Sequence, residues 1–591
     1  MVTISPDSWQ VNRNFYVAWG TNLNLRQYLP CLDWAERYHR RAFISDLTAA
    51  IIVTVLLIPQ SLAYALLAGL PPEMGLYASI LPLICYAIFG TSRTLSVGPV
   101  AVVSLMTATS VGAIAQQGTV DYATAATALA LLSGLILIAL GLFRFGFVTN
   151  FLSHPVVSGF ITASGIIIAL SQLGHILGID GQGQTLLALT HSLSAEITEA
   201  NIFTAVIGVF VLLFLLVCRS YLTPLLTRVG LALQKAEMIA RAAPVVAIVL
   251  TIVATTIFQL EAKGVALVGH VPSGLPAFSA PHITLELIEQ LALPALLISI
   301  IGFVESISVG KALGAKRRQR ISPNQELIGL GTANVASALS GGFPVTGGFS
   351  RSVVNFDAGA QTQAASVMTA AGIALAALLL TPALYYLPKA TLAATIIVAV
   401  TTLIDVNIIK AAWRFSRTDF IAITATIAAT LLFGVEIGVV SGVLASISMH
   451  LYKTTKPHFA IVGTVPGTEH YRNVLRHDVT TYPNLLSLRI DESLYFANAA
   501  YLEEIIYDQI AEHKDVGHVI LMCPAINEID LSALEALDEI NQRLRELGIG
   551  FHLSEVKGPV MDALEKTEFL AQLAGKVYLS HHAAVLELGR P

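Results

Sequence analysis

Two stretches containing Gly and Pro decide the fold of this chain. They are Ser96-Val97-Gly98-Pro99-Val100-Ala101 in the first half and Gly341-Gly342-Phe343-Pro344-Val345-Thr346-Gly347-Gly348-Phe349-Ser350-Arg351 in the second. Each opens a short apolar segment, and two such interruptions at matching positions are typical of transporters whose broken helices point their N-termini at one site. A helix N-terminus favours negative charge, and Arg351 adds a positive charge there. The pair therefore indicates a membrane transporter with an anion site.

The composition excludes a soluble enzyme. Of the 591 residues, 55% are hydrophobic and 12% are charged, whereas soluble domains carry about 25% charged residues. The formal net charge of −5 describes no partner, because the charges lie in the loops and the tail. We expect no nucleic-acid partner. The four cysteines are scattered without a CxxC pair, so we expect no disulfide framework, metal site or bound cofactor.

Hydropathy predicts fourteen membrane helices, because a spanning helix needs about 17–25 mostly apolar residues. They lie near 43–67, 73–90, 99–114, 121–143, 148–175, 201–217, 242–260, 286–313, 324–341, 347–358, 362–386, 391–404, 418–433 and 435–453. The third and tenth are too short to span alone. Because each is third in a run of seven, we predict a 7+7 inverted repeat.

Basic residues fix the expected orientation. Lys and Arg gather in alternate loops, including residues 37–41, residues 316–320 and residues 453–456. The positive-inside rule then places both termini in the cytoplasm and supports an even number of helices. Residues 1–42 lack the pattern of a cleavable signal peptide, so we read them as a cytosolic segment of a cell-membrane protein, inner or plasma.

The composition changes after Lys456, which divides the chain into a membrane domain at 43–456 and a soluble domain at 457–591. The soluble part alternates strands and helices, as expected of a small α/β domain. Strands are predicted at 485–490, 516–522 and 551–554, and helices at 498–512 and 532–547. Asp530 precedes the second helix and is read as its cap.

The candidate substrate-binding residues come from three segments. Arg351 lies within a membrane segment, where a charge is costly and usually marks a transport pathway or an ion pair. Its planar guanidinium group suits an oxyanion. Phe349 and Ser350 precede it. Gln60 and Tyr64 lie four residues apart on one face of the first helix, where they could donate neutral hydrogen bonds or, for Tyr64, only pack.

Glu305 is the candidate ion-coupling residue, with Ser306 beside it. A carboxylate inside a membrane helix is either neutralised by a proton or paired with a cation. It could therefore couple a proton or another cation to the anion. The alternative is a fixed ion pair, for example with Arg351, that holds two helices together.

The chain resembles the SulP anion-transporter family. The resemblance runs from about Arg41 to the C-terminus and is most specific at a few motifs. These are Pro59-Gln60-Ser61-Leu62-Ala63-Tyr64-Ala65, Ser96-Val97-Gly98-Pro99, Val304-Glu305-Ser306-Ile307-Ser308-Val309-Gly310-Lys311, Asn324-Gln325-Glu326-Leu327 and Gly347-Gly348-Phe349-Ser350-Arg351-Ser352.

This resemblance implies a core domain (helices 1–4 and 8–11) that moves against a gate domain (helices 5–7 and 12–14) in elevator-like alternating access. It also implies a homodimer and a C-terminal STAS domain with a possible cytosolic regulator. The implied anion site comprises Gln60, Tyr64, the start of helix three at Val100 and Ala101, and Ser350 with Arg351. In the STAS loop, Leu531 replaces a phosphorylatable Ser, so a phosphorylation switch is not expected.

The resemblance further implies a proton-coupled sulfate symporter, because plant-type sulfate members resemble this chain in carrying Glu at position 305. Bicarbonate members from cyanobacteria, which use sodium, carry Asp there. A sodium-coupled bicarbonate or dicarboxylate transporter is the alternative, followed by an anion exchanger or channel. A membrane-anchored signalling module is disfavoured by the broken helices.

Overall fold

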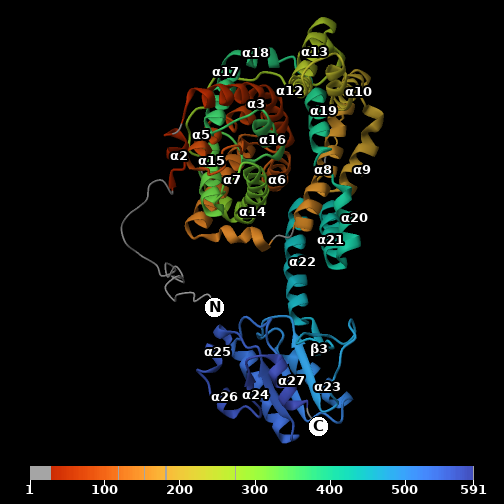
Figure 1. The fold of residues 1–591 in the computed structure, drawn as a ribbon. Helices are drawn as coiled ribbons and strands as arrows, with labels where there is room; N and C mark the ends of the chain where they lie inside the picture. Colours follow the sequence, from red (N-terminus) through yellow and green to blue (C-terminus); the bar gives the residue numbers. More distant parts are fainter. Residues whose placement is uncertain are drawn as a thin grey trace. The chain divides into compact units, whose positions relative to one another are not determined.

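The computed structural model describes residues 28–589 except 37, 118, 152, 153, 180, 182, 273 and 282, so most of the predicted N-terminal segment lies outside the described residues. The chain forms two compact units, divided between Val443 and Leu444 (Figure 1). This division falls inside the last membrane helix. Each unit is described by itself.

The first unit is helical. Its helices are α2 (Cys31–Ala35), α3 (Arg40–Leu67), α4 (Pro72–Tyr77), α5 (Leu81–Phe89), α6 (Ala101–Gly112), α7 (Val120–Leu142), η2 (Phe145–Phe151), α8 (His154–Leu177), α9 (Leu186–Glu196), η3 (Ile197–Glu199), α10 (Ile202–Val217), η4 (Cys218–Leu222), α11 (Thr223–Arg228), α12 (Leu233–Arg241), α13 (Ala243–Phe258), η5 (Leu260–Lys263), α14 (Leu285–Lys316), α15 (Pro323–Leu339), α16 (Phe349–Asp357), α17 (Ala364–Leu379), α18 (Thr381–Leu384), α19 (Lys389–Val400), α20 (Val406–Phe415), α21 (Arg417–Phe433) and α22 (Val435–Thr455). Within the described residues, 7 helices are long and apolar enough to cross a membrane, and shorter apolar helices accompany them.

Two helix groups build this unit. In the first, α15 packs on α5 and α7, α14 on α7, and α17 on α3. In the second, α8 packs on α10, α19 and α21. Figure 1 shows the two groups side by side. Small residues allow the tight contacts: a Cβ on Gly134 of α7 would lie 2.8 Å from the carbonyl oxygen of Gly331 on α15.

The predicted membrane segment at 73–90 matches a candidate span at Pro72–Phe89, which is built of two helices. It is split into α4 and α5 around Ser79, whose hydroxyl contacts the Ser61 hydroxyl at 2.7 Å and donates to the Gly75 carbonyl at 2.9 Å. Pro82 lies in the first turn of α5, where a missing N–H costs nothing. The remaining predicted membrane segments coincide with helices to within a few residues.

A two-stranded sheet, which was not predicted, joins the halves of the unit. Strand β1 (Val97–Gly98) pairs antiparallel with β2 (Thr346–Gly347), with Val97 opposite Gly347. Each strand is followed within three residues by a short helix, β1 by α6 and β2 by α16. The sheet therefore brings the two interrupted stretches together.

The second unit is a six-stranded sheet in the order β4-β3-β5-β6-β7-β8. Its elements are β3 (Phe459–Thr464), β4 (Tyr471–Asn473), β5 (Leu485–Ile490), α23 (Ala499–Glu512), β6 (His518–Met522), α24 (Leu531–Glu546), β7 (Gly550–Ser554), α25 (Gly558–Leu564), α26 (Phe569–Gln572), β8 (Val577–Tyr578) and α27 (His581–Leu588). Strands β5 to β8 are parallel, and β3 is antiparallel to both neighbours.

Two apolar layers hold this sheet. One face packs on α23, α24 and α25, and the other on α27. Asp530 caps α24 as predicted, because its carboxylate accepts a hydrogen bond from the Ala533 N–H at 2.9 Å.

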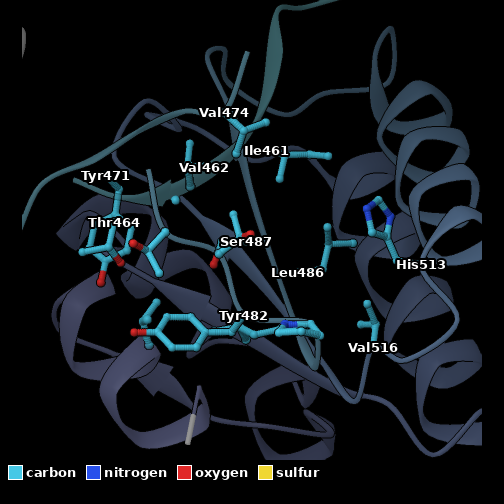
Figure 2. Close-up of a pocket in the computed structure, with 16 residues that line it drawn as sticks. Ile461, Val462, Thr464, Tyr471, Val474, Tyr482, Leu486, Ser487, His513 and Val516 are labelled. Carbon is cyan, nitrogen blue, oxygen red and sulfur yellow. The ribbon is translucent and has the colours of Figure 1, made fainter. Parts of the chain in front are cut away.

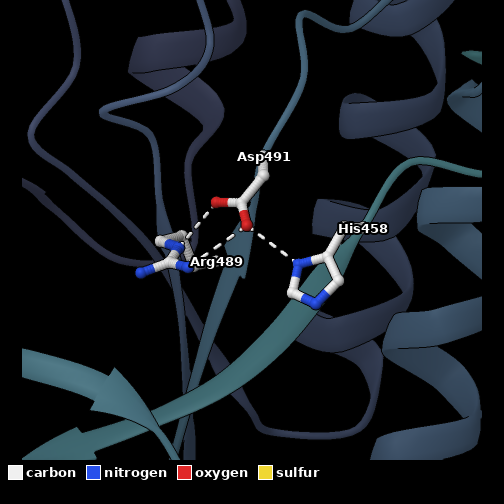
Figure 3. A network of polar contacts seen from close by, with 3 residues as sticks. All are labelled: His458, Arg489 and Asp491. Carbon is white, nitrogen blue, oxygen red and sulfur yellow. Dashed lines mark hydrogen bonds and ion pairs between the residues drawn. The ribbon is translucent and has the colours of Figure 1, made fainter. Parts of the chain in front are cut away.

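A polar network lies where β3 begins. The Asp491 carboxylate accepts hydrogen bonds from Arg489 Nε at 2.7 Å and contacts His458 Nδ1 at 2.9 Å (Figure 3). Burial alone would raise the pKa of Asp491, but the hydrogen bonds from Arg489 and His458 outweigh burial and lower it. The network ties the first residues of β3 to the end of β5.

Candidate functional site

A cavity of about 50 Å³ lies between the two helix groups. Every sequence-predicted site residue except Ser306 lines it. The lining residues are Gln60, Tyr64, Val100, Ala101, Val102, Glu305, Gly348, Phe349, Ser350, Arg351, Ala399, Thr402 and Leu403. A water needs about 10–15 Å³ of such space, so the cavity has room for a small ion.

The N-termini of α6 and α16 reach this cavity. Val100 and Gly348 are the capping positions, and neither helix has a side-chain cap in the part of the chain that the structure describes. The first N–H groups of a helix have no partner within the helix. Two helix ends with free N–H groups therefore converge on one cavity, as the sequence predicted.

Arg351 supplies the positive charge of the site. It is 1% exposed. Its Nη2 donates to the Thr346 carbonyl over a long 3.4 Å, and its Nη1 has no hydrogen-bond partner among the described residues. Leaving a buried donor without a partner costs free energy unless a ligand accepts its hydrogen bond.

Two glycines make the space for the guanidinium. A Cβ on Gly98 would lie 2.5 Å from Nη1 of Arg351, and a Cβ on Gly348 would lie 2.8 Å from its Nε. A Cβ at either position would therefore require the end of the Arg351 side chain to shift. The backbone on both sides of the sheet thus fixes the guanidinium.

Glu305 comes to the same cavity from α14. Its Oε2 is buried without a hydrogen-bond partner among the residues that the structure places. No ion pair joins it to Arg351 in the described part of the chain, although both side chains line the cavity. The alternative of a fixed ion pair is therefore not what the structure shows.

Ser306 differs from the prediction. Its hydroxyl contacts the Gly302 carbonyl and the Thr346 hydroxyl, each at 2.7 Å, and accepts from the Gly347 N–H at 2.8 Å. It is fully buried and does not line the cavity. Adjacent residues on a helix point in different directions, so Ser306 braces strand β2 while Glu305 faces the cavity.

Gln60 and Tyr64 lie on α3, after Pro59, and both face the cavity. Within the described residues, neither side chain makes a hydrogen bond to the protein. Both are therefore available to a ligand as neutral hydrogen-bond partners.

The residues of the opposite wall were not predicted. Ala399, Thr402 and Leu403, at the end of α19 and just after it, close the cavity from the second helix group. Small and apolar residues carry no chemical signal that would have marked them. A larger cavity of about 400 Å³ also contains Gln60 and Ser350, so it adjoins the site and continues outward from it.

Charged side chains line this larger cavity. Arg219 donates to the Thr401 hydroxyl at 2.9 Å, and Arg241 pairs with Asp357 at 3.0 Å. Glu237 also lines this cavity and lies 3.8 Å from Arg241, so acidic side chains offset the charge of Arg241 and the approach carries charges of both signs.

Comparison with known proteins identifies the chain's relatives. The model of the sulfate permease family matches residues 43–426, and that of the STAS domain matches residues 476–584. The chain belongs to the sulfate permease family. As a member of this family it is a multi-pass membrane transporter of anions and not an enzyme, and its second unit contains a STAS domain.

The alignments with curated relatives extend over most of this chain. It is 36% identical to "Sulfate transporter 4.1, chloroplastic" of Arabidopsis thaliana over 560 residues, which is 93% of this chain and 80% of that protein. It is 34% identical to a probable sulfate transporter of Mycobacterium tuberculosis, over 92% of this chain and 95% of that protein.

Solved structures share the fold of this permease. Murine Slc26a9, an anion transporter in the inward-facing state, matches with a TM-score of 0.87 at 23% identity, over 98% of this chain and 97% of that one. The transmembrane domain of the cyanobacterial bicarbonate transporter BicA matches with a TM-score of 0.58 at 20% identity, over 69% of this chain and 98% of that one. The predicted fold class is confirmed.

Proposed function

We propose that this permease is a proton-coupled sulfate symporter. The observation that carries the proposal is the buried Nη1 of Arg351, which lacks a partner among the described residues and lies beside two uncapped helix N-termini. A desolvated oxyanion would accept hydrogen bonds from these donors. Sulfate is the preferred substrate because the curated relatives described above are named sulfate transporters.

Glu305 would carry the coupling proton. Its buried Oε2 has no partner among the described residues, so the carboxylate form is poorly stabilised there. A bound dianion would offset the charge of Arg351, which would otherwise favour the carboxylate. Proton and anion would then bind with positive and reciprocal coupling. Ser306 would support the site only through strand β2.

Movement of the first helix group against the second would give alternating access. The first group carries Gln60, Tyr64, Glu305 and Arg351, whereas the second contributes only the wall around Thr402. A shift of one group past the other would move the substrate together with its ligands. This is an elevator-like mechanism.

Uptake into proteoliposomes tests the proposal. Labelled sulfate and labelled bicarbonate would be offered separately, with and without an inward proton gradient and with and without sodium. We expect saturable sulfate uptake that accumulates only with the proton gradient. Accumulation driven by sodium alone, or bicarbonate preferred over sulfate, would instead support the sodium-coupled alternative.

Uncoupled transport would have a different signature. An exchanger would require anion inside the liposomes, and a channel would never concentrate sulfate against its gradient. Either outcome would overturn symport while leaving the anion site in place.

We also propose a homodimer in the cell membrane, inner or plasma, with both termini in the cytoplasm and a cytosolic partner for the STAS domain. The alternating basic loops support the orientation. Accessibility of single cysteines near either terminus to a membrane-impermeant reagent would test it.

A further inference from the structure

The STAS domain contains a cavity of about 280 Å³ that is separate from the anion site. Strands β3 and β4 form one side, and the start of β5, the loop before it and the segment after α23 form the others (Figure 2). Its volume is close to the lower end of the range of about 300–1,000 Å³ for small-molecule sites. It is therefore large enough for one ring-sized molecule.

The lining of this cavity is uncharged. None of the described residues that line it is Lys, Arg, Asp or Glu. A carboxylate or phosphate placed here would lose its hydration without a cation to replace it, which is costly. The cavity therefore selects against anions, unlike the site in the membrane.

The shape of the cavity favours a flat molecule. In Figure 2 the Tyr482 ring lies along one side, and Val462 and Val474 lie on the opposite side. An aromatic ring between them would stack on Tyr482 and contact branched aliphatic side chains. Such stacking adds about 0.5–1.5 kcal/mol beyond the burial of area.

One buried hydroxyl points to a polar group on the ligand. Ser487 is 5% exposed, and its hydroxyl makes no hydrogen bond to another described residue. Figure 2 places its oxygen in the middle of the lining residues. The hydroxyl reaches the cavity that Ser487 lines, so a ligand with an amide or carbonyl could hydrogen-bond to it.

His513 offers a second neutral contact at the edge. Its Nδ1 lies 2.9 Å from the Gln509 carbonyl, which assigns the proton to Nδ1 and leaves Nε2 as an acceptor. A ligand N–H could donate to this nitrogen.

We propose that the cavity is a binding site for a small, neutral, planar aromatic molecule that stacks on Tyr482 and hydrogen-bonds to Ser487. Strand β3, one of its walls, begins four residues after the last residue of α22 (Thr455 to Phe459). A bound molecule would thus contact the strand that directly follows the last membrane helix.

Ligand-observed NMR on the full-length protein in nanodiscs tests this proposal. Benzamide and benzoate form a matched pair, because they have nearly the same shape but differ in charge. We expect benzamide to give a saturable signal, and we expect Val474→Trp, which fills the cavity, to abolish it. Benzoate should give no signal that Val474→Trp removes.

Ser487→Ala tests the hydroxyl without adding volume. We expect it to weaken benzamide binding about fivefold, which corresponds to the loss of one hydrogen bond of about 1 kcal/mol. Ser532→Ala is the matched control, since Ser532 is exposed on α24 and does not line the cavity. Equal binding of both probes at this cavity, or benzamide binding that neither Val474→Trp nor Ser487→Ala changes, would overturn the proposal.

Discussion

Arg351 can occupy its buried position because two of its neighbours are glycines, which have no side chain. Gly98 of β1 and Gly348, the residue after β2, face the guanidinium, and a methyl group on either would require it to shift. The charge is therefore held by backbone and not by an acidic partner. Its remaining hydrogen-bonding capacity is left for a ligand.

Arg351→Ala should abolish saturable sulfate uptake, and Arg351→Lys should weaken sulfate binding at least tenfold. A charged hydrogen bond contributes about 1.5–3 kcal/mol, and Lys lacks the planar fork of Arg. Isothermal titration with sulfate measures the loss. Arg472→Ala on exposed β4 serves as the control, and wild-type affinity in Arg351→Lys would contradict the assignment.

Gly98→Ala should weaken sulfate binding although no ligand contact is removed. The new Cβ would lie 2.5 Å from Nη1 of Arg351 and must displace it. Gly112→Ala is the matched control, because nothing lies within 4 Å of a Cβ at that position. The same titration compares the two variants. Equal affinities would show that the guanidinium can relax.

Glu305→Gln should keep sulfate binding but lose accumulation driven by a proton gradient. The amide imitates the protonated acid in shape and charge. Counterflow exchange of labelled sulfate, which needs no net proton movement, should persist in this variant. If Glu305→Gln still concentrates sulfate under an imposed proton gradient, Glu305 is not the coupling residue.

Among the elements, α6 and α22 make a contact that links the helix groups. The Ser110 hydroxyl lies 2.5 Å from the Glu436 carboxylate. Helix α6 packs on α3, α7 and α14 of the first group and also on α8 of the second, and Gly438 and Gly442 of α22 fit against α21 of the second. Relative movement of the groups must break this contact.

A disulfide across that contact should therefore stop transport. Ser110→Cys and Glu436→Cys would be combined in a background that lacks the four native cysteines. We expect oxidation to block sulfate uptake and reductant to restore it, while each single variant remains unaffected by oxidant. Full uptake by the cross-linked double variant would show that the two groups do not move apart here.

The sequence predicts the elements well where one physical signal dominates. Hydropathy locates the membrane helices because lipid demands continuous apolar runs, and Gly and Pro mark the starts of α6 and α16. The break between α4 and α5 was missed because Ser79 uses its hydroxyl for local bonds that hydropathy does not register.

Residues of the candidate site can likewise be predicted from the sequence only where their chemistry stands out. Charged or polar residues such as Arg351, Glu305 and Gln60 were found because they are unusual in a membrane. Ala399 and Thr402 are ordinary there, and only tertiary structure brings them to the cavity. Ser306 lies next to Glu305 in the sequence, but its hydroxyl accepts a hydrogen bond from strand β2 and does not line the cavity.

For the molecule as a whole, we expect the STAS domain to lose stability in acid. Burial lowers the pKa of His552 and of His581 in the STAS domain to about 4, from an ordinary value of 6.5. Between these values the unfolded domain binds more protons than the folded one, so stability rises with pH. The stabilisation is complete above about pH 6.5 and is lost as the pH falls toward 4.

Hydrogen exchange of the full-length protein tests this expectation. Protection of β7, corrected for the intrinsic exchange rate, should fall between pH 7 and pH 5. His552→Gln should reduce this dependence on pH. Protection that is equal at both pH values would contradict the expectation.

The pairing of β1 with β2 has a consequence for thermodynamics. Both helix N-termini and Arg351 are joined through these strands, so under the proposed alternating access they would move as one body and keep the same geometry on either side of the membrane. Sulfate should then bind with the same intrinsic affinity from either side, at equal protonation of Glu305. The direction of net flux would follow from the combined electrochemical gradients of sulfate and the coupling ion, and the same protein would release sulfate when the sum of those gradients points outward.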